Sequence, residues 1–164
     1  MIIRLATPAD YAEVGEITVA AYEPFLLGPH DPYGERLRDA ASRAEQAALW
    51  VAVDDDDTLL GSVTDPPTGS AYRELAADDE GEFRMLAVAP RAQGRGVGVA
   101  LARHVVDRSR AAGHRGVVIS SLPQMAAAHR LYGRLGFRRD ADRDWYPLPD
   151  VLLIAFRLDL EPLP

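Results

Sequence analysis

The chain has 164 residues, of which 48% are hydrophobic and 26% are charged, and its formal net charge is −7. These values are typical of one globular domain with a sizeable core, residues 1–164, and they disfavour a disordered chain. The excess of acidic residues argues against nucleic acid as a partner, because phosphate contacts require a basic surface.

The sequence also lacks the features of secreted, membrane and thiol-dependent proteins. No apolar run approaches the roughly 18–20 residues that a membrane span requires, and the first ten residues do not read as a secretion signal. The chain contains no cysteine, which removes disulfides, thiol nucleophiles and thiolate metal sites. We therefore expect a cytoplasmic protein that binds no metal and acts neither on a membrane nor on nucleic acid.

The first third of the chain predicts a strand and two helices. Residues 2–5 are a short apolar run, and the Thr-Pro-Ala-Asp that follows is typical of a helix start. The first helix is predicted to end near Ala21, before Pro24. A second helix is predicted over about 35–48, after a loop rich in proline and glycine.

The middle of the chain predicts three strands and a turn. Apolar runs at 49–53 and 58–63 are joined by Asp54–Asp57. We interpret these four acids as a solvated turn, because calcium loops space their ligands with intervening residues. A third strand is predicted over 82–88.

The last part predicts two further helices and three strands. One helix should run from the glycines near position 96 to about 112, with Gly113 as its C-terminal cap. Ser121 is predicted to cap the next helix, which continues to about Leu135. The predicted strands cover about 116–120, 137–140 and 151–158. The order is mixed α/β, with about seven strands and about four helices.

Three glycines alternate in the sequence Gln93-Gly94-Arg95-Gly96-Val97-Gly98, between a predicted strand and a predicted helix. Glycines let a ligand approach the backbone, and the unpaired amides of a helix start bind anions, phosphate above all. The nucleoside-triphosphate loop requires a Gly-Lys-Ser/Thr ending that is absent here, and the dinucleotide fingerprint requires a glycine or alanine where Val99 or Leu101 stands. A third pattern, Q/R-x-x-G-x-G/A, matches at every specified position.

A second motif lies downstream, where Ala128, Tyr132, Gly136 and Phe137 fit the spacing A-x-x-x-Y-x-x-x-G-F. With the strand before the glycines, these two motifs make the sequence resemble the GCN5-related N-acetyltransferase (GNAT) superfamily over essentially the whole chain. The resemblance implies the acyl-CoA N-acyltransferase fold, with a sheet that splays between its fourth and fifth strands. The chain departs from the family at Met125, where many members carry an asparagine.

The resemblance implies acetyl-CoA as co-substrate and a set of site residues. The pyrophosphate would lie on the amides of Gln93–Gly98 with Arg91 and Arg95 facing phosphates, and the pantetheine arm beside Leu86–Val88. The amide of Leu86 would bind the thioester oxygen, Tyr132 would protonate the departing thiolate, and Glu82 would serve as the base. The residues that this implies for the cofactor are Leu86, Ala87, Val88, Arg91, Gln93, Gly94, Arg95, Gly96, Val97, Gly98 and Tyr132.

The family binds its acceptor between two loops, which correspond to 23–33 and 140–150 here. Phe25, Tyr33, Trp145 and Glu82 are the residues we expect to contact a small-molecule or peptide amine. In the same loops, His30 and Tyr146 could add to the wall, and Asp31, Asp144 or Asp150 could attract a cation.

Two functions remain open at this point: an active N-acetyltransferase, and a catalytically weak acetyl-CoA-binding module that acts as a sensor. Glu82 and Tyr132 favour the enzyme, and Met125 favours the module. The apolar last strand, residues 151–156, could support the edge of a homodimer.

Overall fold

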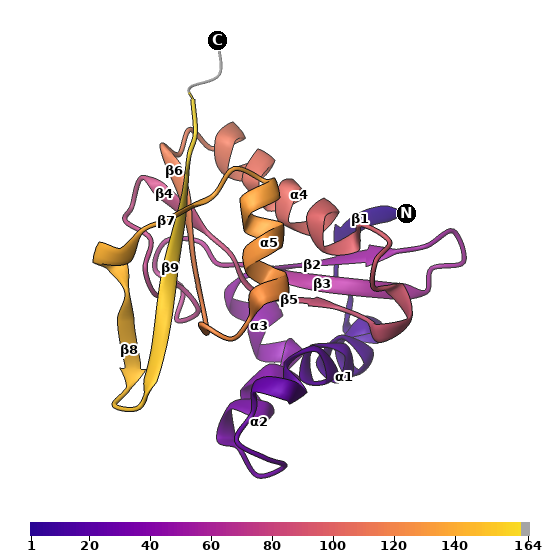
Figure 1. Cartoon of the computed structure of the whole chain (residues 1–164). Helices are drawn as coiled ribbons and strands as arrows, with labels where there is room; N and C mark the ends of the chain where they lie inside the picture. Colours follow the sequence, from indigo (N-terminus) through magenta and orange to yellow (C-terminus); the bar gives the residue numbers. More distant parts are fainter. Residues whose placement is uncertain (162–164) are drawn as a thin grey trace.

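The computed structural model describes residues 1–161, which form a strongly twisted sheet in two halves with helices on both faces (Figure 1). The helices are α1 (Tyr11–Tyr22), α2 (Pro32–Arg38), α3 (Ala40–Gln46), α4 (Val97–Ala111) and α5 (Ala126–Arg134). The strands are β1 (Ile2–Leu5), β2 (Ala48–Val53), β3 (Leu59–Asp65), β4 (Glu80–Glu82), β5 (Arg84–Val88), β6 (Gly116–Ser121), β7 (Arg138–Arg139), β8 (Trp145–Leu148) and β9 (Val151–Asp159).

The two halves of the sheet share no strand. The first half has the order β1-β2-β3-β5, and all its pairs are antiparallel. The second half has the order β4-β6-β9-β7 with β8 paired to β9, and only its β4–β6 pair is parallel.

The predicted strand over 82–88 is divided between the two halves. Phe83 separates β4 from β5, and Met85 has a φ of 51°, a left-handed conformation that costs a side-chain-bearing residue roughly 1–2 kcal/mol. The pairing of β4 with β6 ends at Glu82 and Val118. Beyond that point β5 pairs with β3, and within residues 1–161 no strand covers its other edge. The predicted splay of the sheet is confirmed.

The helices cover the two faces of the sheet. Figure 1 shows α4 and α5 side by side over one face, and α1, α2 and α3 at the other. A Cβ at Gly61 of β3 would lie 3.1 Å from Val97 and 3.2 Å from Leu101, so the absence of a side chain lets α4 approach the sheet. Val51, Val63, Phe83, Leu101 and Val105 are fully buried in the core between these layers.

The expected single helix over 35–48 is wrong, because the chain breaks at Asp39. The backbone of Asp39 leaves the helical region at φ −77° and ψ 71°, and its carboxylate accepts the amide hydrogen of Ser42 at 3.0 Å. Asp39 therefore ends α2 and caps α3. An acid in the middle of a helical pattern resembles a surface residue in sequence, and its capping role depends on this local turn.

Two further expectations differ from the structure. Ser121 is the last residue of β6 and not a cap, since its hydroxyl lies 2.8 Å from Nε2 of His129 and α5 begins only at Ala126. Residues 145–148, expected in a loop, form β8, which pairs with β9 as a hairpin. Of the helices in residues 1–161, none combines the length and the apolar character that crossing a membrane requires.

Candidate active site

The glycine-rich stretch forms an open turn between β5 and the first residue of α4. Gly94 and Gly96 have φ values of 76° and 78°, which side-chain-bearing residues rarely adopt. A Cβ built at either position meets nothing within 4 Å, so bare backbone faces open space there. Gly96 caps α4 without a side chain, and the first turn of this helix carries no acidic residue. Its unpaired amides and the helix dipole suit a diphosphate.

Gly98 and Val97 have different roles from the two glycines before them. A Cβ at Gly98 would lie 2.9 Å from Leu131 of α5, so this glycine permits the close packing of the two helices. The side chain of Val97 is buried in the core. Only the backbone of these two residues is placed to contribute to a phosphate site, whereas Gln93 and Arg95 are exposed.

Arg91 has partners other than a phosphate. Its Nη2 donates to the Glu13 carboxylate at 2.7 Å and to the carbonyl of Leu59 at 2.6 Å. These bonds tie the turn after β5 to α1 and β3. Both bonds use Nη2, so Nη1 and Nε of this exposed guanidinium are left for the predicted phosphate contact.

The free edge of β5 begins where the two half-sheets separate, after Glu82 and Val118; we call this place the divergence. Leu86 and Val88 are half-buried, and the side chain of Ala87 between them is buried. An extended chain can add to such an edge by backbone hydrogen bonds, as a further strand would. Leu86–Val88 thus present the kind of surface that the sequence predicts for the pantetheine arm.

Tyr132 of α5 lies in an aromatic cluster on the opposite side of this divergence. Its ring centroid is 5.4 Å from Phe156, 5.9 Å from Phe137 and 6.2 Å from Phe83. Burial raises the pKa of the Tyr132 hydroxyl well above its usual value, so the group keeps its proton at neutral pH. A buried, protonated hydroxyl can donate a proton but cannot serve as a base.

Glu82, the predicted base, is buried and bound to backbone amides of a loop. Its Oε2 accepts the N–H groups of Leu75 and Ala76, both at 2.9 Å, and the N–H of Glu74 is shared between the two oxygens at 3.1 Å. The side chain is 2% exposed. In this arrangement Glu82 fixes residues 74–76, and no sequence motif points to those three amides.

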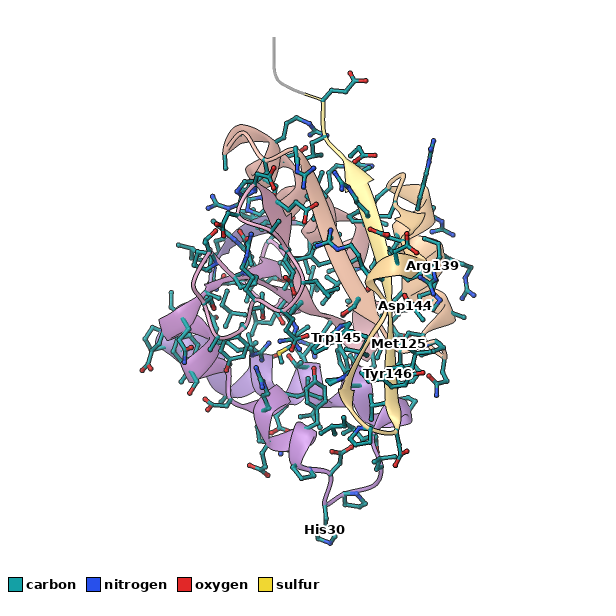
Figure 2. The ribbon with its side chains drawn as sticks, turned by 90° about the vertical axis from the view of Figure 1, so that its left-hand side faces the viewer. His30, Met125, Arg139, Asp144, Trp145 and Tyr146 are labelled. Carbon is teal, nitrogen blue, oxygen red and sulfur yellow. The ribbon has the colours of Figure 1, made fainter. Side chains whose placement is uncertain are left out.

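The predicted acceptor residues come from α2, the short turn after α1, and strands β4 and β8 of the second half-sheet. Tyr33 packs edge-on against Tyr22, with centroids 6.4 Å apart, and burial raises the pKa of its hydroxyl. Trp145 donates from Nε1 to the hydroxyl of Ser120 at 3.4 Å, at the end of β6. Figure 2 shows Trp145 near Met125 and Tyr146, where β8 approaches the divergence. Phe25 is half-buried in the short turn after α1.

Three residues suggested for the acceptor loops are placed elsewhere or occupied. His30 is exposed at a loop tip, far from the other labelled side chains in Figure 2. Asp31 caps α2 by accepting the amide of Tyr33 at 3.0 Å. Asp144 is paired with Arg139 at 2.7 Å and accepts the amide of Ala155 at 2.9 Å, so its charge is already compensated.

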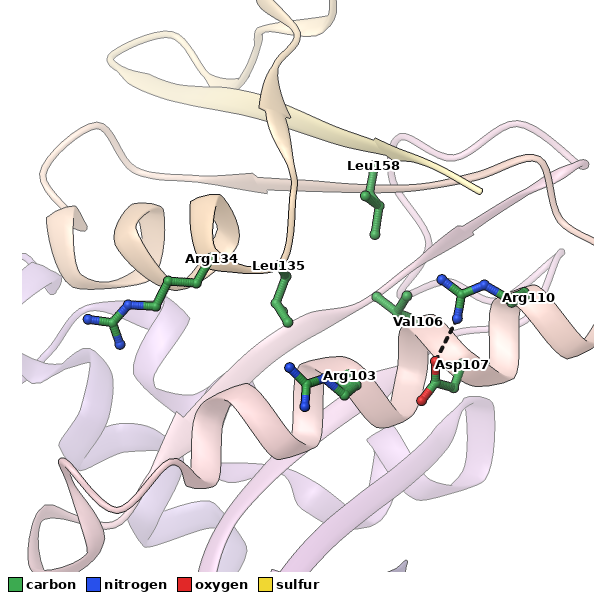
Figure 3. A pocket seen from close by; sticks show the side chains of 7 residues that line it. All are labelled: Arg103, Val106, Asp107, Arg110, Arg134, Leu135 and Leu158. Atoms are coloured by element: carbon green, nitrogen blue, oxygen red, sulfur yellow. Dashed lines mark hydrogen bonds and ion pairs between the residues drawn. The ribbon is translucent and has the colours of Figure 1, made fainter. Parts of the chain in front are cut away.

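A separate hollow of about 220 Å³ lies between α4, α5 and the end of β9 (Figure 3). Arg103, Val106, Asp107, Arg110, Arg134, Leu135 and Leu158 line it. Asp107 and Arg110 pair with each other at 2.6 Å. Its walls include none of the residues predicted for the cofactor or the acceptor, so we do not include it in the candidate site.

The sequence model of the acetyltransferase (GNAT) family matches residues 12–137, which include the glycine turn, both parts of the divided strand and Tyr132. The chain belongs to this family. Similarity to N-acetylaspartate synthetase of Rattus norvegicus amounts to 34% identity over 113 residues, which is 68% of this chain and 35% of the relative. The chain thus spans about a third of the length of the curated relatives it matches first.

Solved structures of the GNAT family share the fold over nearly the full chain. A GCN5-related N-acetyltransferase from Kribbella flavida has a TM-score of 0.71 at 25% identity, with 97% of each chain covered. A putative acetyltransferase from Salmonella typhimurium, determined with its cofactor acetyl-CoA, has a TM-score of 0.70 at 23% identity, covering 100% of this chain and 96% of the other.

In this GNAT chain, sequence reasoning missed two charged residues beside the divergence. Glu74 and Arg84 form an ion pair with 2.7 Å between Oε1 and Nη1. Arg84 stands two residues before Leu86 on the divided strand, a spacing that could have drawn attention to it. Glu74 belongs to an irregular loop, and only the tertiary fold brings it to β5. Within residues 1–161, no group of three or more His, Cys, Asp or Glu side chains is arranged to hold a metal ion.

Proposed function

We propose that this chain transfers the acetyl group of acetyl-CoA to the amine of a small molecule or peptide, as a single domain over residues 1–164. The observation that carries the proposal is the open turn with Gly94 and Gly96 at positive φ, directly beside the uncovered edge of β5. The family match supports it. One relative forms N-acetylaspartate, as its name states, and one solved structure of this fold contains acetyl-CoA.

Each part of the site has a proposed task. Acetyl-CoA supplies an acetyl thioester, which the amine attacks with loss of the thiol. The amides of Gln93–Gly98 bind the diphosphate, and the edge at Leu86–Val88 pairs with the pantetheine arm. The amide of Leu86 stabilises the charge on the carbonyl oxygen, a contribution of about 2.7–4 kcal/mol by analogy with oxyanion holes. Tyr132 gives its proton to the departing sulfur.

The attacking amine must first lose a proton, because an alkyl ammonium has a pKa of about 10.4. The resemblance assigns this step to Glu82. The amides of residues 74–76 that hold its carboxylate favour a positioning role instead.

The diphosphate assignment is tested with two matched glycine variants. Gly96 and Gly113 both have a φ of 78° with no atom within 4 Å of an added Cβ, at opposite ends of α4. Gly96→Ala and Gly113→Ala should therefore lose similar stability, roughly 1–2 kcal/mol. We expect Gly96→Ala to weaken coenzyme A binding at least tenfold in calorimetry, and Gly113→Ala to leave it unchanged. Equal affinities for the two variants would contradict the assignment.

The second candidate is a module that binds acetyl-CoA without turnover, favoured by the engagement of Glu82 with backbone amides and by Met125. A thiol-release assay over a panel of amines separates the two. Release with any amine supports the enzyme, and tight coenzyme A binding without release for all amines supports the module.

A further inference from the structure

Glu74 carries a buried carboxylate oxygen that lacks a partner. Its Oε1 pairs with Arg84, and the two side chains are 18% and 12% exposed. Its Oε2 is buried and receives no hydrogen bond from the described part of the chain. Burial also raises the pKa of this carboxyl group. An unpaired buried oxygen of this kind is costly, and a donor on a bound ligand would satisfy it.

The pair lies beside the edge where we place the thioester. Arg84 is the first residue of β5, two residues after the pairing of β4 with β6 ends at Glu82, and it precedes Leu86 by two residues. Tyr33, a predicted acceptor contact, packs against the buried cluster that contains Tyr72 and Met85, the residue after Arg84. Glu74, Arg84 and Tyr33 therefore form one site at the divergence of the sheet.

The charges around this site favour a ligand that carries both a positive and a negative group. Arg84 also donates to the carbonyl of Tyr72 at 3.2 Å, and Arg36 lies over the Tyr72 ring at 5.0 Å from its centroid. Both bonds of Arg84 use Nη1, and a guanidinium has five N–H donors in a planar fork that suits a carboxylate. Two guanidinium groups thus stand near one carboxylate that keeps an unpaired oxygen.

We propose that the acceptor is an amine that also carries a carboxylate, an α-amino acid or a close analogue, with its carboxylate on Arg84 and its ammonium at Oε2 of Glu74. This rests on the proposed acetyl transfer. A proton passes from the ammonium nitrogen to Oε2, and the lone pair that remains on nitrogen makes it nucleophilic. Glu82 supports the site indirectly, because its bonds to residues 74–76 hold Glu74 in place.

The first experiment compares amines that carry an α-carboxylate with amines that lack one. We expect kcat/KM for L-alanine and L-aspartate to exceed that for L-alaninamide and ethylamine by about 10- to 100-fold, the effect of one or two charge-assisted hydrogen bonds. Equal values would overturn the inference and leave acetyl transfer intact. Calorimetry of L-aspartate and L-alanine with the protein and coenzyme A supplies a readout without turnover, and absence of binding for both would also overturn it.

The second experiment separates the two residues. Arg84→Met should raise KM for L-alanine about 10- to 100-fold and change KM for ethylamine little. Glu74→Gln should lower kcat for both amines and also raise their KM, because the ammonium loses its charged partner. Arg38→Met, at an exposed arginine of α2, is the control. An equal rise of KM for both amines in Arg84→Met would contradict the proposal. If Arg84→Met does not fold, Arg84→Lys is used in its place, because lysine keeps the positive charge but lacks the planar guanidinium group.

Discussion

Glu82 and Glu74 are two carboxylates with different surroundings, and their isosteric variants distinguish a positioning residue from a proton acceptor. In Glu82→Gln one oxygen remains for the amides of residues 75 and 76, so we expect a several-fold rise in KM for the amine with nearly unchanged kcat. Loss of a proton acceptor would instead lower kcat roughly 10²–10⁴-fold. Steady-state rates across pH decide the matter. If kcat of Glu82→Gln, relative to the unchanged protein, falls most at low pH, Glu82 is the base.

Tyr132 is the residue proposed to protonate the departing thiolate, and Tyr132→Phe removes only that capacity. The phenyl ring keeps the contacts with Phe83, Phe137 and Phe156. We expect kcat to fall roughly 10- to 100-fold, the lower part of the range for acid catalysis, because a thiol has a pKa of only about 8.5. Binding of coenzyme A should stay the same. Tyr11→Phe, in the first turn of α1, is the control, and an unchanged kcat in Tyr132→Phe would contradict the assignment.

At the scale of elements, the start of α1 predicts a dependence of stability on pH. Asp10 accepts the amide and the hydroxyl of Thr7 at 2.7 and 2.9 Å and pairs with Arg4 at 2.7 Å. The Arg4 guanidinium, with help from Thr7 and against the effect of burial, lowers the pKa of Asp10 to about 2. Because the folded pKa lies below the unfolded value near 3.9, the stabilisation is complete above about pH 4 and is lost as the pH falls towards 2.

The measurement for this element is urea unfolding of Asp10→Asn and the unchanged protein. We expect the variant to be about 2 kcal/mol less stable at pH 6, and the difference to shrink near pH 2.5. Asp55→Asn, at a fully exposed acid of the β2–β3 turn, should show no such change. A constant difference across pH would show that Asp10 stabilises the helix start through shape and not through charge.

The sequence predicted those elements whose pattern is local. Apolar runs located β2, β3 and β6, and the glycines located the start of α4, because burial and capping act over a few neighbouring residues. Asp39 was missed as a helix break because an acid in a helical pattern resembles a surface residue, and its bond to Ser42 forms only when the backbone turns there. Ser121 was wrongly predicted as a cap because its hydroxyl pairs with His129 of α5. β8 contains Pro147 and is followed by Pro149, and because proline is rare inside strands this segment was predicted as a loop. The pair of Glu74 and Arg84 depends on a loop whose path no motif specifies.

At the scale of the whole molecule, Arg43 joins the layers on the α1 side of the sheet. It is fully buried and donates to the carbonyl of Leu37 at 2.9 Å, to Thr18 at 3.2 Å and to Thr64 at 3.4 Å. Burial lowers the pKa of this guanidinium. These bonds connect α3 with α2, α1 and β3, so one side chain holds three helices and a strand together.

Removal of this side chain should destabilise the protein as a large cavity does. We expect Arg43→Ala to cost about 2–5 kcal/mol in urea unfolding, and Arg43→Met, which keeps most of the volume, to cost less. Arg38→Ala, on the surface of α2, should change the stability by no more than about 0.5 kcal/mol. Equal costs for Met and Ala at position 43 would show that the hydrogen bonds matter more than the packing.

The connection between β3 and β4 is fixed at both ends and irregular between them. Asp65 pairs with Arg108 of α4 at 3.2 Å, and Glu80 pairs with Arg143 at 2.9 Å and with Arg157 at 3.2 Å. None of the residues proposed to hold coenzyme A belongs to this connection, whereas Glu74 does. Protein engineers who redesign this connection would therefore keep the backbone of residues 74–76, because its amides hold the buried carboxylate of Glu82. Exchanges of the side chain at position 74 would then reshape the proposed acceptor site without touching any residue proposed for the thioester donor.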